Sequence, residues 1–360
     1  MQTVKTMKTV QTMQTVKTMK ILQIMKNMKK NINFFLAGVV GAGLVGIFIF
    51  AMVDKKQTDT AYHNLFSKDY RIFTPQMPAK MDFAGEEVPM NLFYVKEAFE
   101  REILVNTFYH SSTILMFKRA NRWFPVIGPI LKKNGIPDDF KFLALAESNF
   151  ANVASPSGAE GFWQFLKPTG IKYGLEITDE VDERYNVEKA TEAACRYFLE
   201  AYAEYKSWTL VAAAFNRGPD GVSKAIERQK ISNYYDLYFV DETSRYVYRI
   251  LAMKQIYYHP VLYGFYLREK EFYPQIPTYT ISVDSTIDDL PSFALNMNIN
   301  YRVLREFNPW LRRYNLPDKS KKTYVLKLPK EGYLRVEVLL KGIPQTEYFF
   351  HDTLSVYDIR

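Results

Sequence analysis

Residues 34–53 contain no charged side chain, and this run of twenty residues separates two parts of the chain that differ in character. A helix of that length spans about 30 Å, which matches the hydrocarbon core of a bilayer. All charged residues before the run are lysines, so the positive-inside rule predicts a cytoplasmic N-terminus and export of the remainder. The end of the run lacks a small-x-small cleavage pattern, which favours an uncleaved transmembrane signal anchor over a cleaved signal peptide.

The first 33 residues are a low-complexity segment of Lys, Thr and Met, with a methionine at every sixth position from Met1 to Met25. Such a polar segment without acids is not expected to fold alone. Seven of the eight surplus positive charges of the chain lie within residues 1–53, so the exported part is close to neutral. This distribution argues against a nucleic-acid partner.

The segment after the anchor divides into a linker and a helical region. Residues 54–87 are mixed in composition and contain proline, which predicts a stalk or linker. From 88 to 270, apolar residues recur with a helical period between short Gly, Pro and Asn signals, which predicts a mainly α-helical domain. Individual helices are expected at 138–148, 187–205, 207–215 and 245–258.

The pattern changes after residue 270. Residues 279–283 and 324–328 alternate like strands, and two short helical patterns, 287–296 and 301–307, lie between them. The order strand, helix, helix, strand predicts a small βααβ module over 271–330. Residues 331–360 form a tail that resembles the opening of another such unit.

One carboxylate stands out within the helical region. Phe140, Leu143, Ala144 and Glu147 fall at positions i, i+3, i+4 and i+7, so Glu147 continues the apolar stripe of its helix. A buried glutamate is costly unless it is paired or protonated. Glu147 is therefore a candidate general acid, and a structural buried pair is the alternative.

Three polar segments follow Glu147 along the chain, at 158–165, 213–218 and 242–247. They contain Gln164, Asn216 and Tyr246 together with aromatic rings. One acid combined with amide, phenol and ring side chains is typical of proteins that bind and cleave a sugar chain.

We expect no cofactor and no metal. The four histidines are far apart and show no ligand spacing, and the sequence has no Gly-rich phosphate loop. Cys195 is the single cysteine, so no intrachain disulfide can form, and its helical context predicts a packed thiol.

Together these segments resemble the lytic transglycosylases of the lysozyme-like superfamily, over residues 88–258. The 279–329 unit resembles a LysM module, although Asp284-Ser285-Thr286-Ile287 departs from the usual Gly-Asp-Thr-Leu opening. The resemblance implies a lysozyme-like catalytic domain over 88–270. It also implies peptidoglycan glycan strands as the partner, and an inner-membrane protein whose catalytic domain lies in the periplasm.

The resemblance implies roles for individual residues. Glu147 matches the catalytic acid, and Tyr246 matches a tyrosine expected close to it. Phe215 replaces the tyrosine of the family's Ala-Ala-Tyr-Asn motif, so one hydroxyl is missing here. The implied substrate-binding residues are Ser148, Gln164, Asn216, Tyr246, Trp163 and Phe215.

The implied reaction cleaves the bond between MurNAc and GlcNAc without water. Glu147 protonates the glycosidic oxygen, the MurNAc 6-hydroxyl attacks its own anomeric carbon, and Glu147 then acts as base. Intramolecular attack has a large effective molarity, so a single acid suffices. The product is a 1,6-anhydro sugar.

Two alternatives stay open on the sequence. A hydrolytic muramidase would need a second carboxylate, such as Glu160 or another acid. A wall-binding scaffold without turnover is the other. Trp163 and Phe215 fit a hydrophobic core as well as a sugar site, and Gln164 and Asn216 fit loop or capping roles. Arg245 and Arg249 are one helical turn apart and predict a solvated or ion-paired face.

Overall fold

The computed structural model describes residues 72, 74–317, 322–341 and 343, together with 19, 23, 25 and 26. The chain divides into two compact units, Met1–Arg71 and Ile72–Arg360. The predicted anchor at 34–53, almost all of the 1–33 segment and residues 344–360 lie outside the described residues. Within the described part of the chain, none of the helices combines the length and the apolar character that crossing a bilayer requires.

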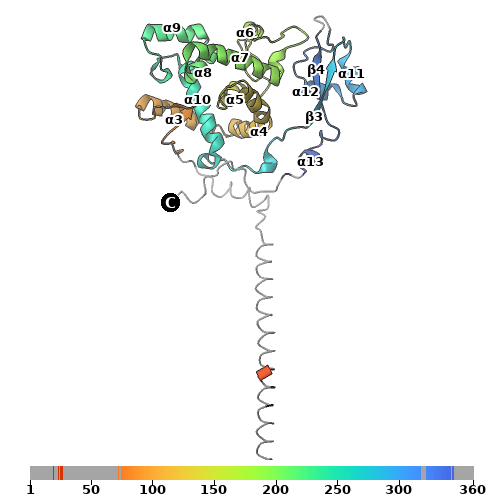
Figure 1. Cartoon of the computed structure of the whole chain (residues 1–360), viewed down its shortest axis with the longest axis horizontal. Helices are drawn as coiled ribbons and strands as arrows, with labels where there is room; N and C mark the ends of the chain where they lie inside the picture. Colours follow the sequence, from red (N-terminus) through yellow and green to blue (C-terminus); the bar gives the residue numbers. More distant parts are fainter. Residues whose placement is uncertain are drawn as a thin grey trace, which may run out of the picture. The chain divides into compact units, whose positions relative to one another are not determined.

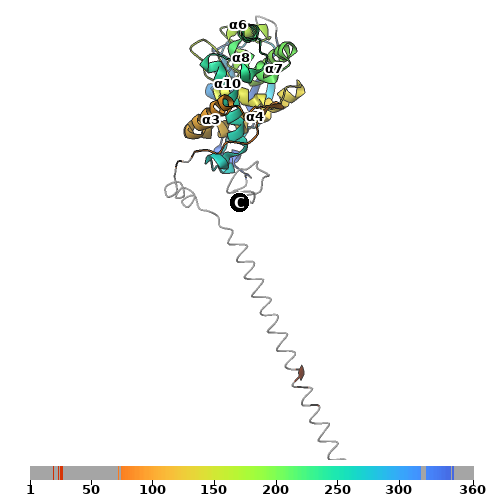
Figure 2. The same ribbon diagram turned by 90° about the vertical axis from the view of Figure 1, so that its left-hand side faces the viewer.

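The unit Ile72–Arg360 is mainly helical, as the sequence predicts (Figures 1 and 2). Its longer helices before residue 270 are α3 (Phe93–Phe108), α4 (His110–Lys133), α5 (Phe140–Ser148), α6 (Lys167–Lys172), α7 (Val187–Tyr205), α8 (Trp208–Arg217), α9 (Pro219–Gln229) and α10 (Asp241–Tyr258). Short 3₁₀ turns are η1 (Glu183–Tyr185), η2 (Tyr234–Asp236), η3 (Pro260–Tyr263) and η4 (Glu269–Glu271).

Helix α5 lies in the middle of this helical region, with α4, α7 and α10 around it (Figure 1). The apolar stripe predicted for this helix is buried, since Phe140, Leu143 and Ala144 have no exposed surface. The Phe140 ring contacts Phe198 of α7 at 4.5 Å and Trp208 of α8 at 5.3 Å between centroids. Packing from several sides therefore holds the short helix that carries Glu147.

The helix boundaries follow local capping signals. Helix α7 begins and ends where the apolar period predicts, and the Asn186 side chain accepts a hydrogen bond from the Lys189 N–H at its N-terminus. Helix α10 begins one turn earlier than predicted, at Asp241, because two acids occupy its first turn and suit the helix dipole. The period of apolar residues does not predict this first turn, because most of its residues are polar.

The structure corrects the C-terminal part of the predicted 54–87 linker. Strands β1 (Asp82–Phe83) and β2 (Glu86–Glu87) pair antiparallel as a short hairpin. Phe83 is fully buried and its ring lies 5.3 Å from that of Phe140. Met81 and Val88 on either side of the hairpin are also buried, so the hairpin belongs to the helical core. The polar residues between these apolar ones conceal this packing in the sequence.

The C-terminal module has the predicted order of elements. Strands β3 (Thr278–Val283) and β4 (Tyr324–Pro329) pair antiparallel, with Ile281 opposite Leu326. Helices α11 (Leu290–Asn296) and α12 (Tyr301–Phe307) lie between them in the chain, and α13 (Val336–Leu339) follows. The module has its own hydrophobic core, which includes Leu290, Leu304 and Leu328.

The 176–188 segment of the helical domain joins this module. The Asp182 N–H donates to the Trp310 carbonyl at 2.8 Å, and the Arg312 N–H donates to the Glu180 carbonyl at 2.7 Å. Val181 and Tyr185 are buried in the core of the module. Backbone pairing and a shared core therefore connect the two parts.

Candidate active site

Glu147 occupies the last turn of α5, one residue before the helix ends. The helix stops there because Asn149 and Phe150 have φ values of +47° and +49°, in the left-handed region. The Glu147 side chain is partly buried. The Tyr246 hydroxyl of α10 donates a hydrogen bond to its Oε1. Two residues separated by 99 positions in the sequence are thereby brought into direct contact.

The environment of Glu147 favours its protonated form. Burial raises the pKa of this carboxyl from 4.5 to about 7, and the charge of Glu242 adds to the rise. The Tyr246 hydrogen bond and the positive charge of Arg249 act in the opposite direction. Burial also holds the pKa of Tyr246 well above its ordinary value, so its phenol stays a hydrogen-bond donor. At neutral pH, Glu147 exists both as an acid and as a carboxylate.

A second buried carboxylate, Glu102 of α3, organises the arginines of α10. It is 1% exposed. Arg245 Nε donates to its Oε1 at 2.7 Å, Arg101 Nη1 lies at 3.2 Å from the same oxygen, and Arg249 Nε lies 3.9 Å from Oε2. Because Arg249 also acts on the pKa of Glu147, Glu102 is electrostatically connected to the candidate acid.

Sequence reasoning missed Glu102, although a signal was present. Val95, Phe99 and Glu102 fall at i, i+4 and i+7 of α3, so Glu102 continues an apolar stripe of its helix. Glu147 was found in the sequence through the same kind of pattern. The ion-paired face predicted for Arg245 and Arg249 is confirmed, and its acid comes from another helix.

Ser148 and Gln164 fix the loop that faces the end of α5. Ser148 is buried, and its hydroxyl donates to the Phe162 carbonyl at 3.0 Å. Gln164 has a φ of +49°, and its Nε2 donates to the carbonyls of Gly161 at 2.8 Å and Val153 at 3.1 Å. Both side chains therefore hold the 158–165 loop.

Only glycine fits at the neighbouring position, Gly161. Its φ is +77°, and a Cβ atom there would lie 2.0 Å from the backbone oxygen of Arg184.

Trp163 belongs to the core, which corrects its prediction as a substrate-binding residue. Its side chain is fully buried, and Nε1 donates to Thr191 Oγ1 of α7 at 3.0 Å. Phe215 is partly buried, with ring contacts at 5.1 Å to Tyr197 and 5.3 Å to Phe198. A pattern of rings near polar residues does not distinguish a ring that packs inward from one that faces a cleft.

Asn216 connects the ends of two helices. Its Oδ1 accepts a hydrogen bond from the Thr243 hydroxyl at 3.0 Å, which links α8 to the first turn of α10. Asn216 therefore lies beside the helix that carries Tyr246.

Glu160, the rival second carboxylate, is held by an ion pair. Arg184 Nη2 lies 3.1 Å from its Oε2 and 2.7 Å from Asp182 Oδ2. The Arg184 guanidinium is buried and neutralises Glu160 as an ion pair. The carboxylate that acts on Glu147 is instead Glu242, exposed in the first turn of α10.

The described residues contain no group of three or more His, Cys, Asp or Glu side chains that could hold a metal ion. Cys195 is buried in α7, and burial raises the pKa of its thiol to about 12.

Comparison with known proteins agrees with the arrangement of the two parts. Residues 125–237 match the transglycosylase SLT domain, and residues 279–332 match the soluble lytic transglycosylase C-terminal LysM-like domain. Membrane-bound lytic murein transglycosylase D of Escherichia coli strain K12 is 29% identical over 191 residues. This match covers 51% of the chain and 41% of the relative, so the chain spans less than half of that protein. The protein of the same name from Escherichia coli O6:H1 gives the same values.

The chain therefore contains a transglycosylase SLT domain that includes Glu147, followed by a LysM-like domain, and over about half of its length it is homologous to membrane-bound lytic murein transglycosylase D.

Proposed function

We propose that this chain is a peptidoglycan lytic transglycosylase that cleaves the β-1,4 bond between MurNAc and GlcNAc and leaves 1,6-anhydroMurNAc ends. The observation that carries the proposal is the contact of Glu147 with the Tyr246 hydroxyl, together with a Glu147 pKa of about 7. A carboxyl with that pKa can give up a proton and take one back near neutral pH.

The proposed reaction uses Glu147 twice. First, the protonated carboxyl transfers its proton to the glycosidic oxygen as the bond to the MurNAc anomeric carbon breaks. The MurNAc 6-hydroxyl oxygen then bonds to that carbon, and its proton passes to the Glu147 carboxylate. The acid is thereby regenerated, and no water is consumed. The attacking hydroxyl belongs to the substrate itself, so its effective molarity is high and no bound water is needed as the nucleophile.

Tyr246 would stabilise the intermediate state of this cycle. After the first proton transfer, Glu147 is a partly buried anion, and a hydrogen bond from a phenol stabilises such an anion by about 1.5–3 kcal/mol. Because the same bond lowers the pKa of Glu147, it also prevents burial from raising that pKa further. Both effects favour a group that serves first as acid and then as base.

The hydrolytic alternative has one specific observation in its favour. Glu242 is close enough to raise the pKa of Glu147, and an inverting hydrolase needs a second carboxylate within roughly 6.5–9.5 Å. Glu160 is less suited to this role because Arg184 binds it.

We further propose that the protein is an envelope enzyme anchored by residues 34–53, with the catalytic domain in the periplasm. The Escherichia coli relative, which matches about half of this chain, is described as membrane-bound. The uncharged run at 34–53 has the length that spans a bilayer core. The LysM-like domain would then hold glycan beside the catalytic domain.

Product analysis tests the reaction directly. The full chain, purified in detergent, is incubated with purified peptidoglycan, and the masses of the released products are measured by mass spectrometry. Anhydro products that disappear in Glu147→Gln and persist in Glu160→Gln support the proposal. Reducing-end products that disappear in Glu242→Gln identify a hydrolase instead. If the protein binds to sacculi and releases no product, the result supports the wall-binding scaffold without turnover.

A further inference from the structure

The 180–185 segment, which contains η1, contacts both the LysM-like module and the 158–165 loop of the candidate active site. On the side of the module, Val181 and Tyr185 are buried in the core of the module. On the side of the loop, the buried Arg184 guanidinium binds residues of the loop. A single short segment therefore connects the module with the loop.

The Arg184 side chain binds both ends of the loop. Its Nη1 donates to the carbonyls of Gly158 at 2.9 Å and Phe165 at 3.1 Å. Its Nη2 lies 3.1 Å from Glu160 Oε2 and 2.7 Å from Asp182 Oδ2, and its Nε donates to Asp182 Oδ1 at 2.9 Å. The guanidinium is planar and its side chain is 6% exposed, so these bonds fix the loop relative to the segment that carries Arg184.

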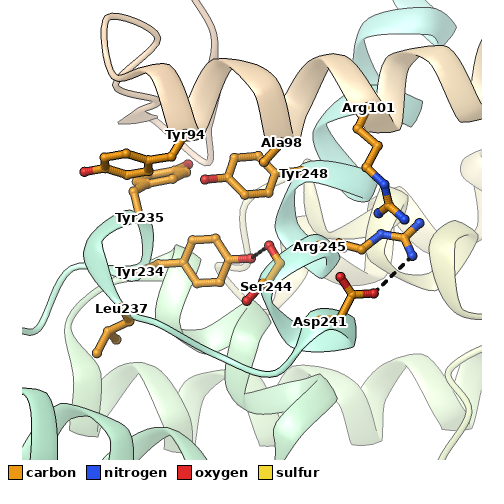
Figure 3. Close-up of a pocket in the computed structure, with 10 residues that line it drawn as sticks. All are labelled: Tyr94, Ala98, Arg101, Tyr234, Tyr235, Leu237, Asp241, Ser244, Arg245 and Tyr248. Carbon is orange, nitrogen blue, oxygen red and sulfur yellow. Dashed lines mark hydrogen bonds and ion pairs between the residues drawn. The ribbon is translucent and has the colours of Figure 1, made fainter.

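Arg184 differs in this respect from Arg245, which lines a pocket between α3, η2 and the first turns of α10 (Figure 3). Arg245 joins two acidic side chains, Glu102 at 2.7 Å and Asp241 at 3.5 Å. Arg184 joins two acids in the same way, and it also binds two backbone carbonyls. Bonds to the backbone fix the path of the loop as well as balancing charge.

Tyr185 provides a second contact between the module and the loop. Its ring centroid lies 4.2 Å from the Arg312 guanidinium of the module. Burial raises the pKa of Tyr185, and a hydrogen bond with Glu160 of the loop adds to the rise. The side chain that packs in the core of the module thus also bonds to the loop.

The loop is bonded in turn to the helix that carries the candidate acid. Ser148, the neighbour of Glu147, donates to the Phe162 carbonyl at 3.0 Å. The Phe162 ring lies 5.4 Å from that of Phe150, which follows the end of α5. A shift of the loop would therefore move the last turn of α5. Misplacement of a catalytic group by about 1 Å can lower a rate by about 100-fold.

We propose that Arg184 is a positioning residue of the active site, and that packing of the LysM-like module on the 180–185 segment holds the 158–165 loop against the end of α5. The module is then a structural part of the active site, whether or not it binds glycan. The effect on catalysis rests on the proposed function, whereas the connection between module and loop can be tested without turnover.

Hydrogen exchange of the full-length protein, followed by mass spectrometry, tests this connection. Several amides of the 158–165 loop donate to backbone carbonyls, so they exchange only when the loop opens. We expect Arg312→Ala to speed exchange of the loop by about 3–10-fold, because it removes the contact with the Tyr185 ring. Arg302→Ala, an exposed arginine on α12 of the same module, is the matched control and should exchange like the parent.

Tyr185→Phe separates the connection from unfolding of the module. It removes only the hydroxyl that bonds to Glu160, so the core of the module stays packed. Exchange of the loop should rise, and exchange of β4 in the same spectra should stay as in the parent. Unchanged exchange of the loop in both Tyr185→Phe and Arg312→Ala, or an increase as large in β4 as in the loop, overturns the connection.

Arg184→Lys tests the positioning role. The variant keeps a positive charge beside Glu160 and Asp182, and it loses the planar set of N–H donors that binds the two loop carbonyls. We expect kcat on purified peptidoglycan to fall about 10-fold or more, because the acid is misplaced, while KM changes by less than about threefold. Arg228→Lys, the same change at an exposed arginine of α9, should keep both values.

The pH profile separates positioning from a loss of folded protein. A loosened loop admits water to Glu147, so its pKa falls from about 7 towards 4.5 and the alkaline limb of kcat/KM moves to lower pH. The groups of α10 that act on this carboxyl, Tyr246, Arg249 and Glu242, are unchanged in Arg184→Lys. A smaller folded fraction lowers the rate without moving the limb, so an unmoved limb overturns the positioning role.

Failure of the proposed function gives a different result. If the parent cleaves no peptidoglycan, the proposed function fails, and hydrogen exchange still decides whether the module holds the loop. If the parent is active and neither the exchange of the loop nor the pH limb changes in the variants, this inference alone fails.

Discussion

At the scale of single residues, opposing effects act on the pKa of Glu147, and burial is the largest of them. Burial favours its neutral form, whereas the Tyr246 hydroxyl and the Arg249 charge favour its anion. One pKa unit corresponds to about 1.4 kcal/mol, so small changes among these neighbours move Glu147 through neutral pH. Its neighbours can therefore be tested individually through the pH dependence of activity.

Tyr246→Phe removes the hydrogen bond that lowers the pKa of Glu147. The pKa should rise above 7, so the alkaline limb of the kcat/KM profile moves to higher pH. The rate itself should fall, because the carboxylate formed after proton transfer loses its donor. A profile that keeps its alkaline limb unchanged would show that the bond does not control this group.

Arg249→Gln and Glu102→Gln should shift the same limb in opposite directions. Loss of the Arg249 charge raises the pKa of Glu147. Loss of the Glu102 charge leaves the Arg249 charge uncompensated, which lowers it. The kcat/KM profiles of the two variants are compared with that of Glu97→Gln, an exposed acid on the same helix as Glu102. Shifts in the same direction would contradict the charge network.

Glu147 should also make the folded protein less stable as pH rises. Its folded pKa of about 7 exceeds the unfolded value of 4.5, so the folded state binds more protons between these pH values. The free energy of unfolding therefore falls as pH rises from about 4.5 to 7. Glu147→Gln should be about as stable as the parent at pH 4 and more stable by about 1–3 kcal/mol at pH 8. Urea unfolding at the two pH values measures the difference, and an equal difference at both would refute it.

At the scale of elements, the hairpin of β1 and β2 anchors the start of α8, the helix that carries Asn216. The Glu86 carboxylate accepts the Thr209 N–H at 3.0 Å, the Thr209 hydroxyl at 2.7 Å and the Trp208 N–H. A carboxylate at a helix N-terminus satisfies free N–H groups and suits the dipole. A segment far away in the sequence thus caps a helix beside the candidate site.

Glu86→Ala should lower the free energy of unfolding by about 1–3 kcal/mol, because it leaves the first N–H groups of α8 without their acceptor. Glu87→Ala, the exposed neighbour in the same hairpin, is the control and should have little effect. Both are measured by chemical denaturation. Equal effects of the two would rule out the capping role.

At the scale of the whole molecule, the connection between the helical domain and the LysM-like module uses both backbone and core. Val181 pairs with Leu311 of the module, and the Arg312 guanidinium lies 4.2 Å from the Tyr185 ring centroid. Lys322 and Glu176 add an ion pair at 2.9 Å. The module therefore contacts the 176–188 segment through backbone pairing, a shared core and an ion pair.

Val181→Asp places a charge in the core of the module and should destabilise the protein by about 3 kcal/mol or more. We expect limited proteolysis to cut between the helical domain and the module in this variant. Val153→Asp changes an exposed valine in the same domain and should leave the digestion pattern unchanged. Identical patterns for the two variants would show that the shared core is dispensable.

What the sequence determined by itself is local in nature. The apolar period of 187–205 predicted both ends of α7, and the alternation at 279–283 and 324–328 predicted the two strands of the C-terminal module. The stripe through Phe140 made Glu147 a candidate. These patterns are readable because each depends on residues within one or two turns of one another.

Tertiary structure alone decided which distant groups meet. Glu102 lies 143 positions from Arg245, and Phe83 packs on Phe140 from a segment that reads as a linker. The inward packing of Trp163 was equally undecided, since an aromatic ring suits a core and a cleft alike. The charge on Glu147 depends on burial and on partners from α10, and such long-range contacts leave no periodic trace in the sequence.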